Sequence, residues 1–182
     1  MNRIMALILI IIFSPIMLFL SALIIFSDGF PVLYRQQRPG RENVLFTFYK
    51  FRSMKKDTPE VATHLLRESE THLLQLGKFM RKLSLDELPN LINVMKGDMV
   101  FVGPRPALYN QYDLIEMRTN MGIHKLKPGV TGWAQVNGRD ELTLSDKVNY
   151  DKYYLDNRSI LLSIKILFIT IRNVLGMRGV SH

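Results

Sequence analysis

Apolar and polar positions follow three patterns in succession along this chain. From Ile4 to Phe26 no residue is charged, and a helix needs only about 20 such residues to cross a bilayer. The middle of the chain alternates short apolar runs with helical periods, and residues 159–176 form a second long apolar stretch at helical spacing. The pattern predicts a membrane element at residues 1–28 and a single α+β domain at residues 29–182.

The first apolar segment contains a break near its middle. Pro15 has no N–H, so the carbonyl of Ile11 loses its helical donor, and Ser14 can bond back to the preceding turn and bend the helix. Arg3 precedes the segment, and seven of the eight charged residues between 29 and 56 are basic. Positive charge favours the cytoplasmic side at both ends. We therefore expect a re-entrant helical hairpin bent at Ser14 and Pro15, with a kinked transmembrane helix as the alternative.

Short strands and helices are expected in the domain. The patterns predict a strand or hairpin arm at Val44–Met54, two helices after Thr58 and Pro59 divided at Gly77, a helix at Leu88–Met99 closed by Gly97, and strands leading into loops at Met99–Pro106 and Gly129–Arg139. No internal repeat and no flexible linker interrupts this order.

The second apolar stretch is amphipathic. Lys165 and Arg172 lie seven residues apart and share one helical face, and no acidic residue follows Asp156. A basic amphipathic helix at about 159–176 fits the headgroup layer of an anionic leaflet. A helix packed into the core of the domain fits the same pattern equally well.

Composition narrows the chemistry. The chain has no cysteine, which excludes disulfides, thiolate metal sites and cysteine nucleophiles. The net charge of +8 favours an anionic partner, such as an anionic lipid, a phosphorylated substrate or a nucleic acid. No basic helix or aromatic-basic strand of the nucleic-acid-binding kind is present, so nucleic acid is not expected. The four histidines lack metal-ligand spacing and are expected at surface or packing positions.

Two adjacent carboxylates, Asp86 and Glu87, precede an apolar run in "RKLSLDELPN". Ser84 and Glu87 have the spacing of a capping box. Pro89 disturbs the first turn, so either this turn is irregular or the regular helix begins at Pro89. Both cases hold Asp86 at a helix N-terminus, where the dipole favours the ionised carboxylate and attracts phosphate. Such a carboxylate can act as a nucleophile towards phosphorus.

This chemistry needs cations, because a carboxylate and a diphosphate repel each other. The candidates are Lys50, Arg52, Arg81 and Arg105, with Mg²⁺ held by Asp86 and Glu87. Pro104 and Pro106 flank Arg105 and stiffen its backbone. The turn Asn137–Arg139 can present a further phosphate-binding arginine.

Five segments occur in one order: "QQRPG", "FTFYKFRSM", "RKLSLDELPNLINVMKGDMVFVGPRP", "KPGVTGWAQVNGR" and "YDKYYLDN". Over nearly the whole chain they resemble the bacterial sugar transferase family, in particular the small monotopic polyprenyl-phosphate phosphoglycosyl transferases in their minimal catalytic form. The Ser-Pro break in the first apolar segment matches this family as well.

The resemblance implies an enzyme on the cytoplasmic face of the bacterial inner membrane. It would move a sugar-1-phosphate from a UDP-sugar to undecaprenyl phosphate and release UMP, by a ping-pong mechanism with Mg²⁺, in the first membrane-committed step of glycoconjugate synthesis. Asp86 would attack the β-phosphate to form a covalent phosphosugar intermediate, with Glu87 assisting as base or through the metal. The remaining implied contacts are Lys50, Arg81, Arg105 and Arg139 on phosphate or nucleotide, and Pro104 and Pro106 around Arg105.

Other functions stay open at this point. A membrane-tethered, Mg²⁺-dependent nucleotide-sugar hydrolase would use the same carboxylates and need no lipid acceptor. A basic membrane-anchored binding or scaffold protein would use "SLDE" only as a helix cap. The expected partners of the enzyme are the UDP-sugar, undecaprenyl phosphate and anionic lipid, and a homo-oligomer is also compatible.

Overall fold

The computed structural model describes residues 2–56, 58, 72–138 and 141–176. The helices are α1 (Asn2–Asp28), α2 (Gln75–Lys82), α3 (Asn90–Lys96), α4 (Tyr112–Asn120), α5 (Trp133–Val136), α6 (Leu144–Asp156) and α7 (Ile160–Leu175). The strands are β1 (Leu33–Pro39), β2 (Leu45–Phe51), β3 (Val100–Val102) and β4 (Gly129–Thr131). Short 3₁₀ turns are η1 (Arg41–Asn43), η4 (Leu85–Glu87) and η5 (Ile123–Lys125).

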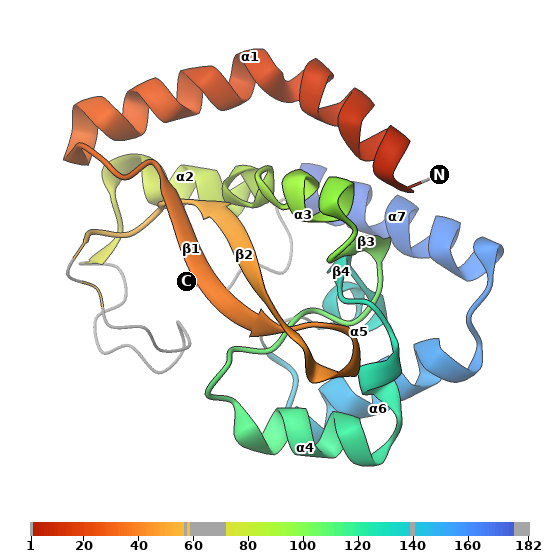
Figure 1. The fold of residues 1–182 in the computed structure, drawn as a ribbon. Helices are drawn as coiled ribbons and strands as arrows, with labels where there is room; N and C mark the ends of the chain where they lie inside the picture. Colours follow the sequence, from red (N-terminus) through yellow and green to blue (C-terminus); the bar gives the residue numbers. More distant parts are fainter. Residues whose placement is uncertain (1, 57, 59–71, 139–140, 177–182) are drawn as a thin grey trace.

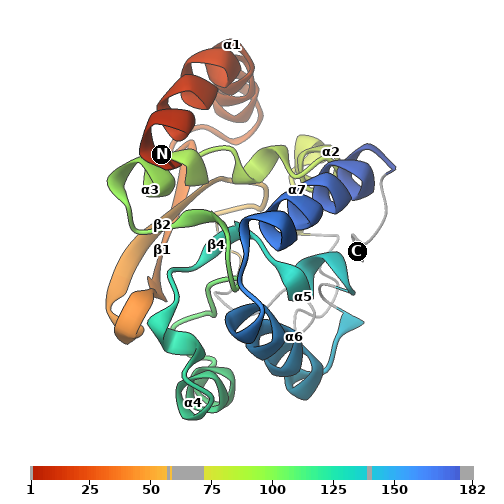
Figure 2. The same ribbon diagram turned by 90° about the vertical axis from the view of Figure 1, so that its right-hand side faces the viewer.

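The strands form two small sheets among these helices. β1 and β2 make an antiparallel hairpin that pairs Leu33 with Phe51 and Pro39 with Leu45. β3 and β4 pair in parallel, with Val100 opposite Gly129. In Figures 1 and 2, α1 lies over one side of the domain with α2 and α3 beneath it, and α4 lies at the opposite end. The predicted mixture of helices and short strands is confirmed.

α1 bows over the domain and is packed into it near both ends (Figure 1). Ala6 joins a core with Phe48, Val94 and Met99. Leu20 and Ile24 join a second core with Phe51 and Met80. Ala6, Leu20 and Ile24 are the buried residues of α1, so the middle of the helix lies away from the domain.

Close contacts of charged side chains are found at the same two ends. Near the N-terminus, the guanidinium of Arg3 lies against Gly97, so close that a Cβ built on this glycine would be 2.4 Å from Arg3 Nη2. At the other end, Arg52 Nη1 lies 3.1 Å from Asp28 Oδ2, and its Nη2 donates to the Gly29 carbonyl at 2.6 Å. The helix is therefore fixed to one domain at each end.

The predicted break at Ser14 and Pro15 does not produce a hairpin in the structure. α1 continues through Pro15 as one helix of 27 residues. The Ser14 hydroxyl donates to the carbonyl of Ile11 at 2.7 Å, and this is the carbonyl that Pro15 deprives of its backbone donor. The hydroxyl thus replaces the missing hydrogen bond, and the helix bows without turning back.

α1 has the character of a membrane-associated element. Within the described residues it is the one helix long and apolar enough to cross a bilayer, with a mean hydropathy of 2.9 over 18 residues. Only 11% of this window is buried against the domain. So large an exposed apolar surface indicates association with a membrane.

Two of the predicted elements differ from those in the structure. Gly77 lies inside α2 and divides nothing there; a Cβ at this position would lie 2.0 Å from the Ser53 carbonyl oxygen, so the glycine allows a close backbone approach. The predicted strand at Gly129–Arg139 ends after Thr131 and is followed by α5. The helix expected to begin at Pro59 lies outside the described residues.

α7 packs into the core along one face, as expected from one of the two alternatives considered for it. Ser159 caps its N-terminus by accepting a hydrogen bond from Leu162 N at 3.1 Å. Ile166 is fully buried and packs with Val102 and Tyr154. The apolar residues of its other face are exposed, namely Ile160, Leu161, Ile164, Leu167, Phe168, Ile171 and Leu175. One stripe of α7 therefore belongs to the core, and the other presents an apolar surface.

Candidate active site

The carboxylate pair lies in η4, between α2 and α3. The predicted capping box does not form: Ser84 is left-handed, with φ 54° and ψ 23°, and makes no side-chain cap. Its N–H donates to the Arg81 carbonyl at 3.0 Å, so Ser84 ends α2 and cannot at the same time begin a helix in the extended cap conformation. The irregular first turn expected from Pro89 is confirmed, because α3 proper begins only at Asn90.

Asp86 is buried among groups of both signs. Its exposed fraction is 6%. Burial raises the pKa of the Asp86 carboxyl, and the neighbouring Glu87 raises it further. Lys50, Arg81 and Arg105 oppose this rise in pKa through their positive charge. These cations come from β2, α2 and the loop after β3, so the fold brings side chains from three separate elements to one carboxylate.

Glu87 forms an ion pair with Arg105. The distance from Arg105 Nη2 to Glu87 Oε1 is 2.7 Å, and the Glu87 side chain is 11% exposed. A charge-assisted hydrogen bond at this depth fixes the arginine relative to the carboxylate pair. The side chain of Arg105 keeps 32% exposure, so it remains accessible to a ligand.

The charged groups around Asp86 also act on Lys50. Desolvation lowers the pKa of its ammonium to about 8, with Arg81 and Arg38 adding to the decrease and Asp86 opposing it. The side chain as a whole is only partly buried, whereas its ammonium end is desolvated. Its Nζ lies 5.1 Å from the centre of the Tyr34 ring. An anionic ligand would raise this pKa again and so favour the charged form of the lysine.

Arg38 is a member of the cluster that sequence reasoning did not single out. Burial lowers the pKa of its guanidinium to about 10, and Arg105 contributes to the decrease. Its Nη1 donates to the Pro106 carbonyl at 2.9 Å, and its guanidinium lies over the Phe48 ring at 4.4 Å. The available signal was the alternation in β1, which places Gln36 and Arg38 on one face of the strand.

The loop Gly103–Pro106 is held through three successive carbonyls. Gly129 N donates to the Pro104 carbonyl at 2.9 Å, Arg118 Nη1 to the Arg105 carbonyl at 2.8 Å, and Arg38 Nη1 to the Pro106 carbonyl. The first of these contacts needs a glycine, because a Cβ at Gly129 would lie 2.2 Å from Gly103 N. Arg105 is thus mounted on a backbone clamped by three elements.

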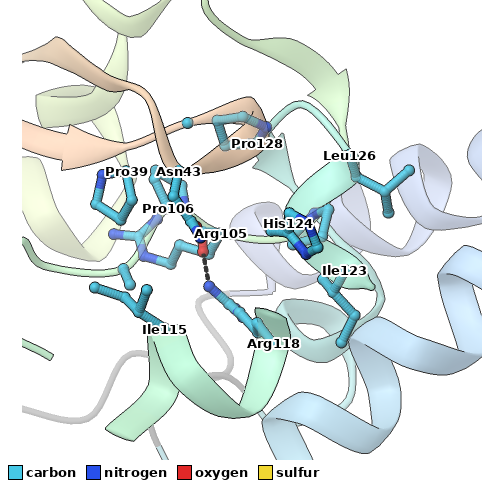
Figure 3. Close-up of a pocket in the computed structure, with 13 residues that line it drawn as sticks. Pro39, Asn43, Arg105, Pro106, Ile115, Arg118, Ile123, His124, Leu126 and Pro128 are labelled. Carbon is cyan, nitrogen blue, oxygen red and sulfur yellow. Dashed lines mark hydrogen bonds between the residues drawn. The ribbon is translucent and has the colours of Figure 1, made fainter. Parts of the chain in front are cut away.

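A pocket lies beside this loop. Figure 3 shows Arg105, Pro106 and Arg118 around it, with Asn43 and His124 also on its wall. Asp86, Glu87 and Lys50 are not among its lining residues. The pocket therefore shares only the Arg105 loop with the carboxylate pair.

The remaining predicted cations have different positions. Arg81 donates from Nε to Ser53 Oγ at 3.2 Å and belongs to the cluster around Asp86. The structure does not bring Arg52 to this cluster, since its guanidinium is engaged by Asp28 and Gly29 at the end of α1. Arg139 lies outside the described residues.

The two carboxylates fit a magnesium site of the kind completed by substrate. Among the described residues no group of three His, Asp or Glu side chains is placed to hold a metal. Mg²⁺ characteristically takes one or two carboxylates together with waters and substrate phosphates, and Asp86 and Glu87 provide that donor set. Asn90, one turn later, is 1% exposed, and both polar atoms of its amide have no hydrogen-bond partner in the described part of the chain. Such a buried amide requires a water or a ligand.

The arrangement suits chemistry on a phosphate. A buried carboxylate is held beside a second one, and three cations face the pair from separate elements. Cations so placed attract a phosphate and offset its repulsion from the carboxylates, while the carboxylate offers a nucleophile.

Comparisons with known proteins show the family of this chain. The family described as bacterial sugar transferase matches residues 1–177, and the chain belongs to this family. It is 43% identical over 169 residues to an uncharacterized sugar transferase, EpsL, of Bacillus subtilis strain 168, covering 93% of this chain and 82% of that protein.

Two further relatives carry more specific names. The UDP-N-acetylgalactosamine-undecaprenyl-phosphate N-acetylgalactosaminephosphotransferase of Aeromonas hydrophila is 38% identical, over 96% of this chain and 43% of its own length. The undecaprenyl-phosphate galactose phosphotransferase of Salmonella typhimurium is 37% identical, over 94% of this chain and 39% of its own length. The chain therefore spans less than half of each of these two proteins, and most of the Bacillus one.

Proposed function

We propose that the protein transfers a sugar-1-phosphate from a UDP-sugar to undecaprenyl phosphate at the cytoplasmic face of the inner membrane. The observation that carries the proposal is the buried Asp86 beside Glu87, faced by Lys50, Arg81 and Arg105. Membership of the sugar transferase family and the names of the Aeromonas and Salmonella relatives support the substrate class.

The proposed reaction has two displacements at one phosphorus. A carboxylate oxygen of Asp86 attacks the β-phosphorus, and the bond from this phosphorus to the bridging oxygen breaks. The electron pair leaves with UMP, and the sugar phosphate stays bound to Asp86 as an acyl-phosphate. An oxygen of undecaprenyl phosphate then attacks the same phosphorus, and the carboxylate leaves, which yields undecaprenyl diphosphate sugar and free Asp86.

The surrounding side chains bind and orient the diphosphate in this proposal. Lys50 and Arg81 attract its oxygens and balance the charge of the carboxylates. Arg105 is held by Glu87 and faces the leaving group or the acceptor phosphate. A magnesium ion bound by Asp86, Glu87 and the substrate would neutralise phosphate charge. Burial of Asp86 removes the water that would shield its charge and hydrolyse the intermediate.

The position of α1 supports a monotopic arrangement. Arg3 and Asp28, near its two ends, both contact the same domain, so a helix that crossed the membrane would have to break one of these contacts. We place both ends on the cytoplasmic side, with the apolar middle around Pro15 dipping into one leaflet. The lipid acceptor and the soluble nucleotide-sugar would then meet at the membrane surface.

A transfer assay tests the proposal directly. The protein in detergent would be incubated with Mg²⁺, undecaprenyl phosphate and a UDP-sugar carrying radioactive phosphorus at its β-position. UDP-galactose, UDP-glucose and UDP-N-acetylgalactosamine are the first donors to test, since relatives are named for these sugars. We expect label to move into the organic phase with release of an equal amount of UMP.

The outcomes separate the alternatives. Label in free sugar phosphate without any lipid acceptor would indicate a hydrolase and contradict the transferase. Absence of any turnover with all three donors, under conditions where a relative is active, would favour a binding or scaffold protein.

A further inference from the structure

Arg118 and Asp151 form a buried ion pair outside the carboxylate cluster. Arg118 Nη2 lies 2.5 Å from Asp151 Oδ2, and the two side chains are 12% and 1% exposed. They come from α4 and α6, 33 residues apart in sequence. A buried pair of this kind is often no more stabilising than an apolar pair of the same volume, so its presence calls for another explanation.

The second arm of the Arg118 guanidinium reaches the active-site loop. Its Nη1 donates to the backbone carbonyl of Arg105 at 2.8 Å, as the dashed line in Figure 3 shows. The side chain of this same Arg105 holds Glu87 at 2.7 Å. A continuous chain of contacts therefore runs from Asp151 through Arg118 and Arg105 to the carboxylate pair.

The prolines make this contact especially important. Pro104 and Pro106 have no N–H groups, so the loop is held chiefly through the carbonyls described above. Gly129 and Arg38 hold the carbonyls of the two prolines. Arg118 holds the carbonyl between them, which belongs to Arg105, the residue whose side chain reaches Glu87. A guanidinium can bind a carboxylate with one arm and a carbonyl with another, whereas a lysine ammonium lacks this planar geometry.

We propose that Arg118, oriented by Asp151, is a positioning residue that fixes the Arg105 backbone and so holds the Arg105 guanidinium at Glu87. The inference rests on the proposed transferase function. In this role Arg118 acts through Arg105 and needs no contact of its own with the substrate. Loss of the contact lets the Arg105 guanidinium leave its productive position, so kcat falls even in variants whose stability is restored.

The test is a set of variants in the transfer assay, each with its kcat, its KM for the UDP-sugar that the wild type turns over, and its thermal unfolding. Arg118→Met is expected to lower kcat by about 10- to 100-fold, as expected for a misplaced catalytic contact. The double variant Arg118→Met/Asp151→Leu removes both charges, and we expect it to recover the unfolding temperature of the wild type while kcat stays low. Recovery of kcat along with stability would show a merely structural pair and overturn the proposal.

A mutant cycle with Arg105 adds a second readout. If Arg118 acts through Arg105, adding Arg118→Met to Arg105→Ala should change kcat by less than about twofold. Full additivity of the two losses would contradict the proposal. The matched control is Lys152→Met/Asp156→Leu, which removes an exposed ion pair from the same helix, α6, and should leave kcat unchanged.

The two proposals fail differently. If the wild type transfers sugar phosphate and folded Arg118 variants keep their kcat, the positioning role is wrong and the transferase stands. If the wild type has no transfer activity, the proposed function fails, and the positioning role fails with it.

Discussion

Two aspartates of this protein are similar in burial and different in their surroundings. Asp86 is 6% exposed and Asp151 is 1% exposed, and burial raises the pKa of both carboxyls. Asp151 has one close partner, Arg118, which satisfies its charge directly. Asp86 instead has a second carboxylate beside it and cations from three separate elements around it.

Under the proposed function, this difference separates a reactive carboxylate from a supporting one. A single guanidinium neutralises Asp151 and leaves its pair to orient other groups. The Asp86 cluster holds more positive charge than one carboxylate needs and a second negative charge that repels the first, which are conditions for binding a phosphate or a metal ion. Burial and a raised pKa alone do not separate the two residues.

The largest loss of transfer activity is expected for Asp86→Asn. Removal of the nucleophile should lower transfer by about 10⁴-fold or more. The unfolding temperature should stay unchanged or rise, because a buried charge is removed. Asp113→Asn, which changes an exposed aspartate in the first turn of α4, is the control and should keep full activity. Turnover within tenfold of the wild type would refute the role of Asp86.

Asp151→Leu should destabilise the fold, whereas Asp86→Asn should not. It leaves the Arg118 guanidinium buried without its partner, and we expect the free energy of unfolding to fall by about 3 to 5 kcal/mol. Urea unfolding followed by circular dichroism measures this change. Asp156→Leu, on the exposed pair of α6, should change it by less than about 0.5 kcal/mol. Equal effects of the two substitutions would show that the Arg118 pair carries no structural role.

Asn90 and Asn93 extend the contrast to two buried amides of α3. Asn93 donates to the Thr47 carbonyl at 2.7 Å and accepts from Tyr49 N at 3.2 Å. Asn90→Leu removes an amide that has no protein partner in the described part of the chain, so it should cost less stability than Asn93→Leu while lowering transfer. Asn93→Leu breaks satisfied bonds and should destabilise. A loss of stability for Asn90→Leu as large as that for Asn93→Leu would contradict the view that the Asn90 amide lacks a protein partner.

The smallest expected effect is on the pH dependence of kcat/KM, through the charge of Lys50. Its pKa of about 8 in the free protein means that the ammonium loses its charge as the pH rises through 8. Since kcat/KM reports the free enzyme, it should fall above about pH 8. Lys50→Arg keeps the charge and should move this limb to higher pH. Lys96→Arg, whose lysine lies over the ring of Tyr49, should leave the profile unchanged. An unshifted limb in Lys50→Arg would assign it to another group.

Local signals in the sequence predicted much of the fold. Apolar alternation located β2, Gly97 ended α3 as expected, and the apolar stretch at about 159–176 located α7. The signals failed where a tertiary contact decided the backbone. Gly77 looked like a helix divider and instead allows α2 to approach Ser53. Ser84 looked like a helix cap and instead ends the preceding helix.

The sequence predicted only part of the candidate site, because tertiary contacts decide where some of its residues lie. Lys50, Arg81 and Arg105 do gather around Asp86. Lys50 and Arg52 are two residues apart and were expected to share a role, but β2 ends at Phe51 and Arg52 turns to the end of α1. Arg118 and Asp151 could not be predicted, because only the folded chain brings α4 and α6 to the same loop.

The covalent intermediate on Asp86 is the central claim, and intact-mass analysis tests it most directly. The protein would be incubated with Mg²⁺ and the active UDP-sugar, without any lipid acceptor, and quenched quickly. The account predicts a mass increase of one sugar phosphate per chain, stoichiometric UMP, and an adduct that maps to Asp86 after proteolysis. Transfer to added undecaprenyl phosphate by a protein that forms no such adduct and releases no UMP beforehand would contradict it.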